Sequence, residues 1–314
     1  MKQPVPPSIV ANAPGSAMLF GEHAVLRGGY AVAAAIDCRL SVTLTPRDDA
    51  IIEVHSCLGT AATTIDALAF PPSFRFIEGA FSLYKGRLPS GACLTITSGI
   101  DPCVGLGSSA SVTVALLAAL QRWIDSSSDR QTLLHNCCSV IRTVQGYGSG
   151  ADAASIIYGG IVSYQAQTLA VTPLLDTLPL VLLYSGKKTP TPEVIRYVNA
   201  LEHRLPEVYK GIFSTINDVT CEAIAALRCA DYPKVGQLMN HAGGLMEALG
   251  VSTKELSSLC WALREVPSIF GAKISGSGLG DAAIGLGTIG EASIGRQLPS
   301  TVASKGIEVM TWEE

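Results

Sequence analysis

Charged side chains are scarce in this sequence, and no stretch of it is rich in lysine or arginine. Only 15% of its 314 residues are charged, and the formal net charge at pH 7 is -4. Proteins that bind nucleic acid usually carry a basic stripe or patch that meets the phosphates. The sequence therefore argues against a nucleic-acid partner, whereas its 48% of apolar residues is ample for folded cores.

Segments that direct a chain to a membrane are missing as well. The first ten residues, MKQPVPPSIV, lack the basic flank and apolar run of a secretory signal. The uncharged stretch 102–121 is long enough for a membrane span, but glycine, serine and threonine fill its first half. Those residues suit a loop and a helix start better, so we expect no membrane association and a cytoplasmic location.

Two chemical signatures are also absent. The nine cysteines follow no regular spacing, and the five histidines do not cluster with cysteines or carboxylates along the sequence. This pattern predicts buried, reduced cysteines and gives no support for a structural zinc site. The pattern GxxxxGK[ST] of the P-loop NTPases does not occur either.

Short strands and longer helices are what the apolar patterns do predict. Strands are expected at 8–13, 17–20, 30–45, 51–55, 92–97, 272–274 and 282–286 and within 174–186, and helices at 110–123, 193–201, 215–227 and 235–249. The strand at 51–55 is expected to pair with the one at 30–45. Because the two kinds of element alternate irregularly, we predict an α+β fold with two domains, 1–168 and 169–314.

The strongest chemical signal is the loop GLGSSA at 105–110, which leads directly into the helix expected at 110–123. Glycines let the backbone approach a phosphate closely, and the helix start adds unpaired N–H groups and the positive end of its dipole. Ser108 or Ser109 also offers a hydroxyl that can ligate Mg²⁺. The alternatives are a simple capped helix start and a dinucleotide-binding turn, and residues 100–103 between strand and loop argue against the latter.

Two further glycine-rich segments stand out. In GSGAD at 148–152, Asp152 is either a helix N-cap or a partly desolvated carboxylate that orients or deprotonates a substrate hydroxyl. In KISGSGLGD at 273–281, the glycines either form a plain hairpin turn or let the backbone line a ligand.

Taken in order, these segments resemble the motifs of the GHMP kinase superfamily over nearly the whole chain. PGSAMLFGEHAV at 14–25, DPCVGLGSSA at 101–110, GSGAD followed by YGG at 158–160, and KISGSGLGD each have a counterpart there. The GEHAV run favours the mevalonate-type members. The resemblance implies an N-terminal domain like ribosomal protein S5 domain 2, a ferredoxin-like C-terminal domain, and an active site between them that takes ATP with Mg²⁺.

The resemblance also implies roles for individual residues. ATP would be bound by Gly105, Leu106, Gly107, Ser108, Ser109, Ala110, Gly276 and Gly278, of which Gly105, Gly107, Ser108 and Ser109 would hold the phosphates and the last two would line the cleft near them. Catalysis would rest on Asp152, on Ser16 at the position of the first-motif lysine, and on Lys187 and Lys188 as substitute cations. The acceptor would meet Glu22, His23, Gly150 and Thr189, and the metal would be held by Ser109 and Glu22.

The sequence departs from the superfamily at several of these positions. Ser16 stands where members have a lysine that polarises the acceptor and the phosphoryl group. The acidic metal ligand of mevalonate kinases has no counterpart in Val140-Ile141-Arg142, although Arg142 is a further candidate for the missing cation. Asp281 stands where many members have glycine, and Cys103 replaces the first glycine of the second motif.

We therefore expect an ATP-dependent kinase that phosphorylates the hydroxyl of mevalonate or a similar small hydroxy acid. The alternatives are a phosphomevalonate kinase, a member acting on another small acceptor, and a nucleotide-binding member without turnover. The oligomeric state stays open, with a homodimer as one option.

Overall fold

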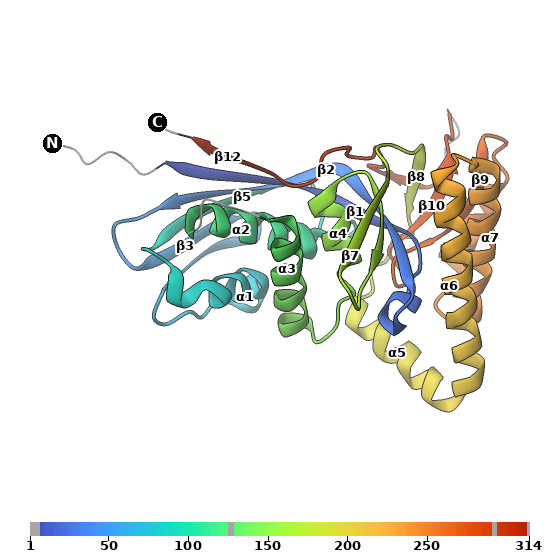
Figure 1. Cartoon of the computed structure of the whole chain (residues 1–314), viewed down its shortest axis with the longest axis horizontal. Helices are drawn as coiled ribbons and strands as arrows, with labels where there is room; N and C mark the ends of the chain where they lie inside the picture. Colours follow the sequence, from blue (N-terminus) through green and yellow to red (C-terminus); the bar gives the residue numbers. More distant parts are fainter. Residues whose placement is uncertain (1–6, 125–128, 291–293, 313–314) are drawn as a thin grey trace.

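The computed structural model describes residues 7–124, 129–290 and 294–312, and within these ranges the strands form two sheets (Figure 1). The larger sheet contains β1 (Ser8–Phe20), β2 (Tyr30–Pro46), β3 (Ile51–Ser56), β4 (Gly59–Thr64), β5 (Ala92–Ser98), β6 (Ile161–Gln165), β7 (Ala170–Leu175) and β12 (Glu308–Trp312). The smaller sheet contains β8 (Leu180–Tyr184), β9 (Ile269–Ser275), β10 (Ala282–Gly287) and β11 (Arg296–Leu298).

Most of the helices pack beside one of the two sheets. Near the larger sheet lie α1 (Arg75–Tyr84), α2 (Ser108–Ile124), α3 (Arg130–Gln145), α4 (Ala151–Tyr158) and the short 3₁₀ helices η1 (Ala24–Arg27), η2 (Pro72–Phe74) and η3 (Lys85–Arg87). The remaining helices are α5 (Thr191–Arg204), α6 (Pro206–Arg228), α7 (Tyr232–Ala248) and α8 (Lys254–Arg264), of which α6 packs on α7 and also contacts β1, β2 and β7 of the larger sheet.

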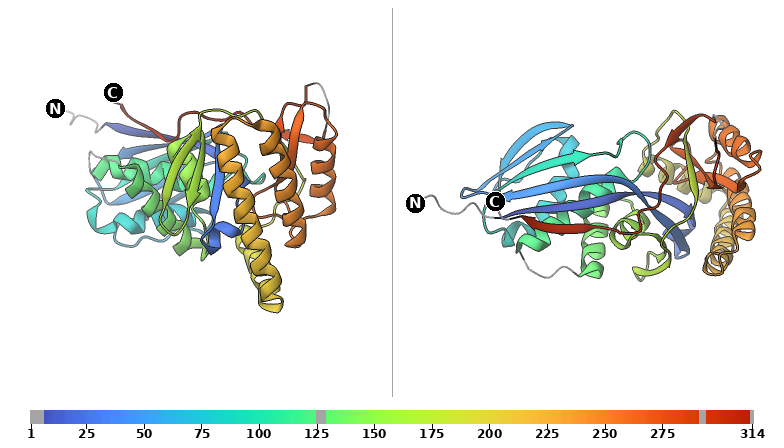
Figure 2. Two further views of the ribbon diagram at one scale, coloured as in Figure 1. Left: turned by 45° about the vertical axis from the view of Figure 1, so that its right-hand side comes forward. Right: turned by 90° about the horizontal axis from the view of Figure 1, so that it is seen from above.

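The long strand β2 organises the larger sheet. Its first half is a run of small apolar residues buried on both faces, whereas its second half alternates between buried and half-buried positions. The first half pairs with β6 and the second with β5, and β1 runs antiparallel to both halves. β12 pairs with the outer side of β1, so the last strand of the chain returns to the N-terminal sheet (Figure 2).

Helices cover one face of the larger sheet. α2 and α4 pack on β1 and β2, and α1 and α3 pack on α2 (Figure 1). α2 is therefore a central helix, with buried residues all along it from Ala110 to Gln121. This confirms the prediction of a helix that is apolar nearly all round.

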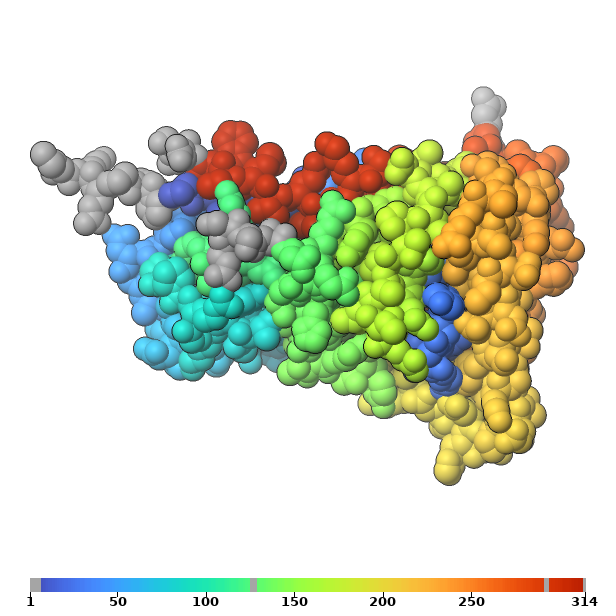
Figure 3. All heavy atoms as spheres, in the orientation of Figure 1, coloured from blue at the N-terminus to red at the C-terminus, as the bar shows by residue number. Residues whose placement is uncertain are grey.

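The smaller sheet is antiparallel, in the order β11-β8-β10-β9, and α7 and α8 pack on it. A second hydrophobic core forms between this sheet and its helices. Ala24 of η1 belongs to that core although it lies only four residues beyond the end of β1. In Figure 3 this N-terminal segment is the blue strip between α6 and the β6–β7 region.

Several expectations about the elements need correction. β1 is one strand with a register shift at Ala13/Gly15, because the Pro14-Gly15 break is absorbed as an irregularity within the strand. β3 pairs with β4 and, in parallel, with β5, and does not pair with β2. The helix expected at 215–227 begins at Pro206, and α3 was not predicted. The α+β class is confirmed, while the division at 168/169, which falls between the paired strands β6 and β7, stays a prediction.

The cysteines are only partly as expected. All nine are free, but four are buried and four are exposed: Cys38, Cys137, Cys138 and Cys260 against Cys57, Cys103, Cys221 and Cys229. Stretch 102–121, considered above as a span, is a loop followed by most of α2. Among the described residues no helix combines the length and apolar character needed to cross a membrane.

Candidate active site

A cleft of about 640 Å³ lies where the two sheets and their helices meet. One wall comes from β1, the loop 105–110 and the start of α4, and the other from the loops that follow β8 and β9. All three glycine-rich segments predicted to carry chemistry contribute to its lining. The cleft therefore brings together segments that are far apart in the sequence.

The loop at 105–110 requires its glycines. Gly105 has φ 82° and Gly107 has φ 71°, conformations that residues with a side chain rarely adopt. Ser16 N–H donates to the Leu106 carbonyl at 3.1 Å, which fixes the loop against β1. Ser108 and Ser109, at the first turn of α2, then face the cleft. The positive end of this helix and its free N–H groups suit an anion.

Asp152 lies on the floor of the cleft, in the first turn of α4. The helix N-cap is Gly150, so the N-cap alternative for Asp152 is wrong. Ser16 Oγ donates to Asp152 Oδ1 at 2.8 Å and lies 3.0 Å from Ser155 Oγ. Burial raises the pKa of the Asp152 carboxyl, while the Ser16 hydroxyl and the charge of Lys188 act in the opposite direction.

Asp281 faces the same cleft from the loop between β9 and β10. The residue is 7% exposed, and its side chain lies against the loop at 105–110, since a methyl group placed on Gly105 would come within 2.6 Å of Asp281 Cγ. Its φ of 65° is unusual for a residue with a side chain. Burial, helped by the charge of Asp152 and opposed by Lys188, raises the pKa of Asp281 to about 6.

Of the two lysines predicted as substitute cations, only Lys188 lines the cleft. Its Nζ donates to the Pro102 carbonyl at 2.7 Å. Its charge partly offsets the effect of burial, which raises the pKa of both Asp152 and Asp281. Lys187 is exposed, and its carbonyl accepts from the Asp281 N–H at 2.8 Å. The third candidate, Arg142, donates to the Gly148 carbonyl at 3.3 Å and does not line the cleft.

Glu22 and His23 lie where β1 ends, and both line the cleft. Glu22 Oε1 pairs with Lys273 Nζ, a fully buried ammonium on β9 that also donates to the Ile274 carbonyl. This ion pair already neutralises Glu22, and its predicted role as a metal ligand stays a prediction. His23 Nε2 donates to the Ser277 carbonyl at 2.9 Å, and burial lowers the pKa of the imidazole.

The cleft brings together most of the predicted residues but not all. Those on its lining are Ser16, Glu22, His23, Gly105, Gly107, Ser108, Ser109, Ala110, Gly150, Asp152, Lys188 and Gly276. Leu106 is a core residue that contributes its carbonyl, and Gly278 packs against the Val251 backbone. Thr189 Oγ1 donates to the Leu279 carbonyl at 2.6 Å, so it supports the loop beside the cleft.

Sequence reasoning missed other residues of this site. Lys273 and Asp281 were quoted within a motif without a role, and Ser277 and Arg75 were not singled out, although the last three line the cleft. The available signal was a lysine inside an otherwise apolar strand, since charged groups in such strands are normally paired. Arg75 had no signal, because it comes from α1, which was not predicted.

Unpaired polar atoms gather in this cleft. Among the described residues, five buried side-chain atoms have no hydrogen-bond partner, and three of them belong to cleft residues: His23 Nδ1, Ser277 Oγ and Asp281 Oδ1. Buried polar groups in folded proteins are nearly always paired, so such a concentration marks a place that a ligand completes. The cleft is therefore built for a polar ligand.

A smaller, mostly apolar cavity of about 170 Å³ adjoins the cleft. Phe74, Phe76, Ile96 and other side chains line it, and it shares Ser108 and Ser109 with the cleft. A ligand that spans both spaces would have a flat apolar part in one and a charged polar part in the other. This combination suits a nucleotide.

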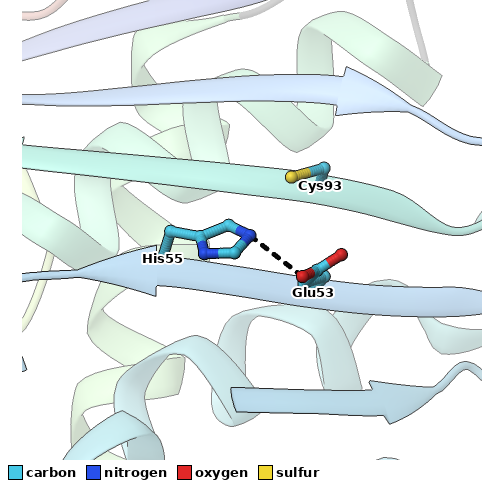
Figure 4. A group of neighbouring side chains, drawn as sticks. All are labelled: Glu53, His55 and Cys93. Atoms are coloured by element: carbon cyan, nitrogen blue, oxygen red, sulfur yellow. Dashed lines mark ion pairs between the residues drawn. The ribbon is translucent and has the colours of Figure 1, made fainter. Parts of the chain in front are cut away.

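A group of metal-ligand type lies elsewhere, on the larger sheet. Glu53, His55 and Cys93 come together because β3 and β5 pair in parallel, which puts Glu53 opposite Cys93 (Figure 4). Sequence analysis did not predict this cluster, because Cys93 is far from Glu53 and His55 in the sequence. Glu53 pairs with the His55 ring at 3.0 Å and with the Arg47 guanidinium at 3.2 Å, so its carboxylate already has two partners. None of these residues lines the cleft.

Comparison with known proteins agrees with the motifs. The family model of the GHMP kinases N terminal domain matches residues 75–160, and that of the GHMP kinases C terminal domain matches residues 223–300. A mevalonate kinase of Thermococcus sibiricus is 32% identical over 292 residues, covering 87% of this chain and 87% of that protein.

Solved structures are similar over nearly the whole chain. The mevalonate kinase of L. major in complex with R-mevalonate superposes with a TM-score of 0.72 at 25% identity, covering 93% of this chain and 91% of the other. The galactokinase of Lactococcus lactis in complex with galactose has a TM-score of 0.83 at 19% identity, covering 96% and 95%, and shows the shared fold alone.

Proposed function

This chain belongs to the GHMP kinase family, and we propose that it transfers the terminal phosphoryl group of ATP to the hydroxyl of mevalonate. The relatives support the acceptor, because the similar protein of Thermococcus sibiricus is a mevalonate kinase. The observation that carries the proposal is the cleft with its three unpaired buried polar atoms. A substrate hydroxyl can donate to His23 Nδ1, a phosphate oxygen can accept from the Ser277 hydroxyl, and a cation can bind Asp281 Oδ1.

In our proposal, ATP spans the two adjoining spaces. Its base enters the apolar cavity, and its phosphates pass over Ser108 and Ser109 at the start of α2, which both spaces share. The left-handed backbone at Gly105 and Gly107 keeps side chains away from that path. Helix dipole and backbone N–H groups then attract the phosphates.

Asp152 is the group that we propose to orient or deprotonate the acceptor hydroxyl. It lies on the floor of the cleft, held by the Ser16 hydroxyl at 2.8 Å. A raised pKa brings its proton affinity closer to the working pH, which makes a carboxylate a better base. Ser16 thus serves to position the carboxylate, and does not replace the charge of a lysine.

Lys188 is the cation that we propose in place of the lysine missing at Ser16. It reaches the cleft from the opposite wall, and its charge is felt by Asp152. A cation at this place stabilises the charge that develops on the transferred phosphoryl group. Lys187 is exposed and outside the cleft lining, so the structure favours one lysine of the pair.

We further propose that Mg²⁺ accompanies ATP. The residues present fit this ion, because the cleft offers carboxylate and hydroxyl oxygens, the ligands of a hard cation, and Asp281 Oδ1 has no partner among the described residues. Ser109 Oγ and a cleft carboxylate would hold it. The bound ion supplies neutralisation of phosphate charge.

The cleft favours an unphosphorylated acceptor. Glu22 is already paired with Lys273, so the described lining sets the cationic side chains Arg75 and Lys188 against the carboxylates of Asp152 and Asp281. A phosphorylated acceptor adds negative charge that this balance does not offset. We also propose a cytoplasmic location, which nine free cysteines suit, and a homodimer stays a prediction.

The test is Mg²⁺-dependent ADP release with mevalonate, phosphomevalonate and galactose as separate acceptors, for the wild-type protein and Asp152→Asn. We expect turnover with mevalonate that falls by at least about 10²-fold in the variant. Turnover with only another acceptor contradicts the substrate. ATP binding without turnover on any acceptor contradicts the catalytic role.

A further inference from the structure

Asp281 is the least explained charged group in the cleft. The residue is only 7% exposed, yet its Oδ1 meets no hydrogen-bond donor among the described residues. None of the described cationic side chains forms an ion pair with it, and the nearby Lys188 Nζ donates to the Pro102 carbonyl instead. A buried carboxylate in this position is costly unless something binds it.

The backbone holds this carboxylate in place rather than letting it turn to solvent. The Asp281 N–H donates to the Lys187 carbonyl at 2.8 Å, and its carbonyl accepts from the Ser185 N–H at 2.9 Å. The residue is fixed in the left-handed region at φ 65°, where a side chain adds strain. Strain of this kind persists where the surrounding structure enforces it, and it is concentrated at functional sites.

The Asp281 carboxylate also faces the loop at 105–110, where we propose that the phosphates of ATP bind. Its Cγ and Oδ1 lie beside Gly105 of the loop that leads into α2, and Oδ2 lies near Gly276 of the opposite loop. Phosphates bound along this path would be repelled by Asp281 and by Asp152 on the floor of the cleft. A divalent cation between carboxylate and phosphate turns this repulsion into attraction.

We propose that Asp281 is a ligand of the divalent cation that accompanies ATP, an inference that rests on the proposed function. Mg²⁺ typically binds through one or two carboxylates plus the phosphates of the substrate, and Asp281 offers an unpaired oxygen on the C-terminal wall for that purpose. The acid that the N-terminal wall lacks at Val140-Ile141-Arg142 is thereby supplied from the other side of the cleft.

The experiment uses Mn²⁺ as an EPR-visible probe with the ATP analogue AMPPNP, on the full chain. Free Mn²⁺ is measured during titration of the protein–AMPPNP complex, with Mn²⁺ bound by AMPPNP alone subtracted. Asp281→Asn keeps the size of the side chain, and Asp101→Asn is the matched control, because Asp101 is exposed and outside the cleft lining. Calorimetry then measures AMPPNP binding in EDTA for the same three proteins.

We expect Asp281→Asn to weaken Mn²⁺ binding by about 10- to 100-fold, the range typical for loss of a metal-site partner, and Asp101→Asn to leave it unchanged. In EDTA we expect the opposite sign, because removing the negative charge lets metal-free AMPPNP bind at least as tightly as in the wild type. Mn²⁺ affinity within twofold of wild type, or equal weakening with and without metal, overturns the inference.

These outcomes are separate from the failure of the proposed function. A wild-type protein that binds Mn²⁺ and AMPPNP but does not phosphorylate mevalonate contradicts the substrate, and the response of Asp281→Asn still decides the metal ligand. A wild-type protein that binds no AMPPNP overturns both.

Discussion

The buried carboxylate of Asp281 has a consequence for stability that is measurable without any ligand. Because the folded protein raises the pKa of this group from 3.8 to about 6, the proton is held more tightly in the folded than in the unfolded state. Each pKa unit corresponds to about 1.36 kcal/mol, so the ionised carboxylate costs the folded state about 3 kcal/mol at neutral pH. Asp281→Asn removes this cost and keeps the shape of the protonated side chain.

The sign of the pH dependence follows from the same shift. Below about pH 4 the carboxyl is protonated in both states, so wild type and variant should differ little. Between about pH 4 and pH 6 the unfolded state loses its proton first, and the wild type loses stability relative to the variant. Above about pH 6 the variant should stay more stable by up to about 3 kcal/mol.

Urea unfolding in EDTA, followed by circular dichroism between pH 4.5 and pH 8, measures this difference. Asp101→Asn is the opposite control: the Cys103 N–H lowers the pKa of this exposed carboxyl, so its removal should not stabilise the protein at neutral pH. A variant Asp281→Asn that is less stable than the wild type at pH 7.5, or a difference that does not change with pH, would refute the reasoning.

Three further predictions concern the cleft. Ser16→Ala removes the hydroxyl that stabilises ionised Asp152, so the pKa of Asp152 should rise further and the acidic limb of the kcat/KM profile should move to higher pH. Lys188→Ala should lower kcat by about 10²-fold or more, whereas Lys187→Ala, outside the cleft lining, should change it less than about twofold in steady-state assays. Lys273→Ala leaves a buried carboxylate unpaired and should cost about 3–5 kcal/mol in urea unfolding, and a small effect would contradict the buried ion pair.

Much of the site was predictable because its chemistry is local in sequence. The GLGSSA segment predicts a helix start after a glycine-rich loop. In the structure α2 begins at Ser108, and Gly105 and Gly107 before it have the left-handed backbone conformation. The pairing between distant residues was not predictable. Lys273 and Glu22 are 251 positions apart, and no pattern in either segment predicts that their side chains form an ion pair.

The fold was predictable in class and in its apolar elements, less so in its connections. The alternation in 51–55 identifies a strand but carries no information about its neighbour, and β3 pairs with β5 rather than β2. Pro14-Gly15 reads as a break because proline lacks an N–H, yet β1 continues through a register shift. Asp281 was noted only as a departure, because its burial depends on the loop at 105–110 folding against it.

Contacts between η1 and the helices α5 and α6 join the two walls of the cleft at one edge. Arg27 pairs with Glu202 of α5 and lies 3.7 Å above the Phe213 ring of α6, so the walls are fastened firmly at this edge. At the other edge they meet through exposed contacts such as Lys188 with the Pro102 carbonyl and Arg296 with Asp101. Exposed ion pairs contribute little to stability, so we expect the two walls to separate more readily at this second edge than at the η1 edge.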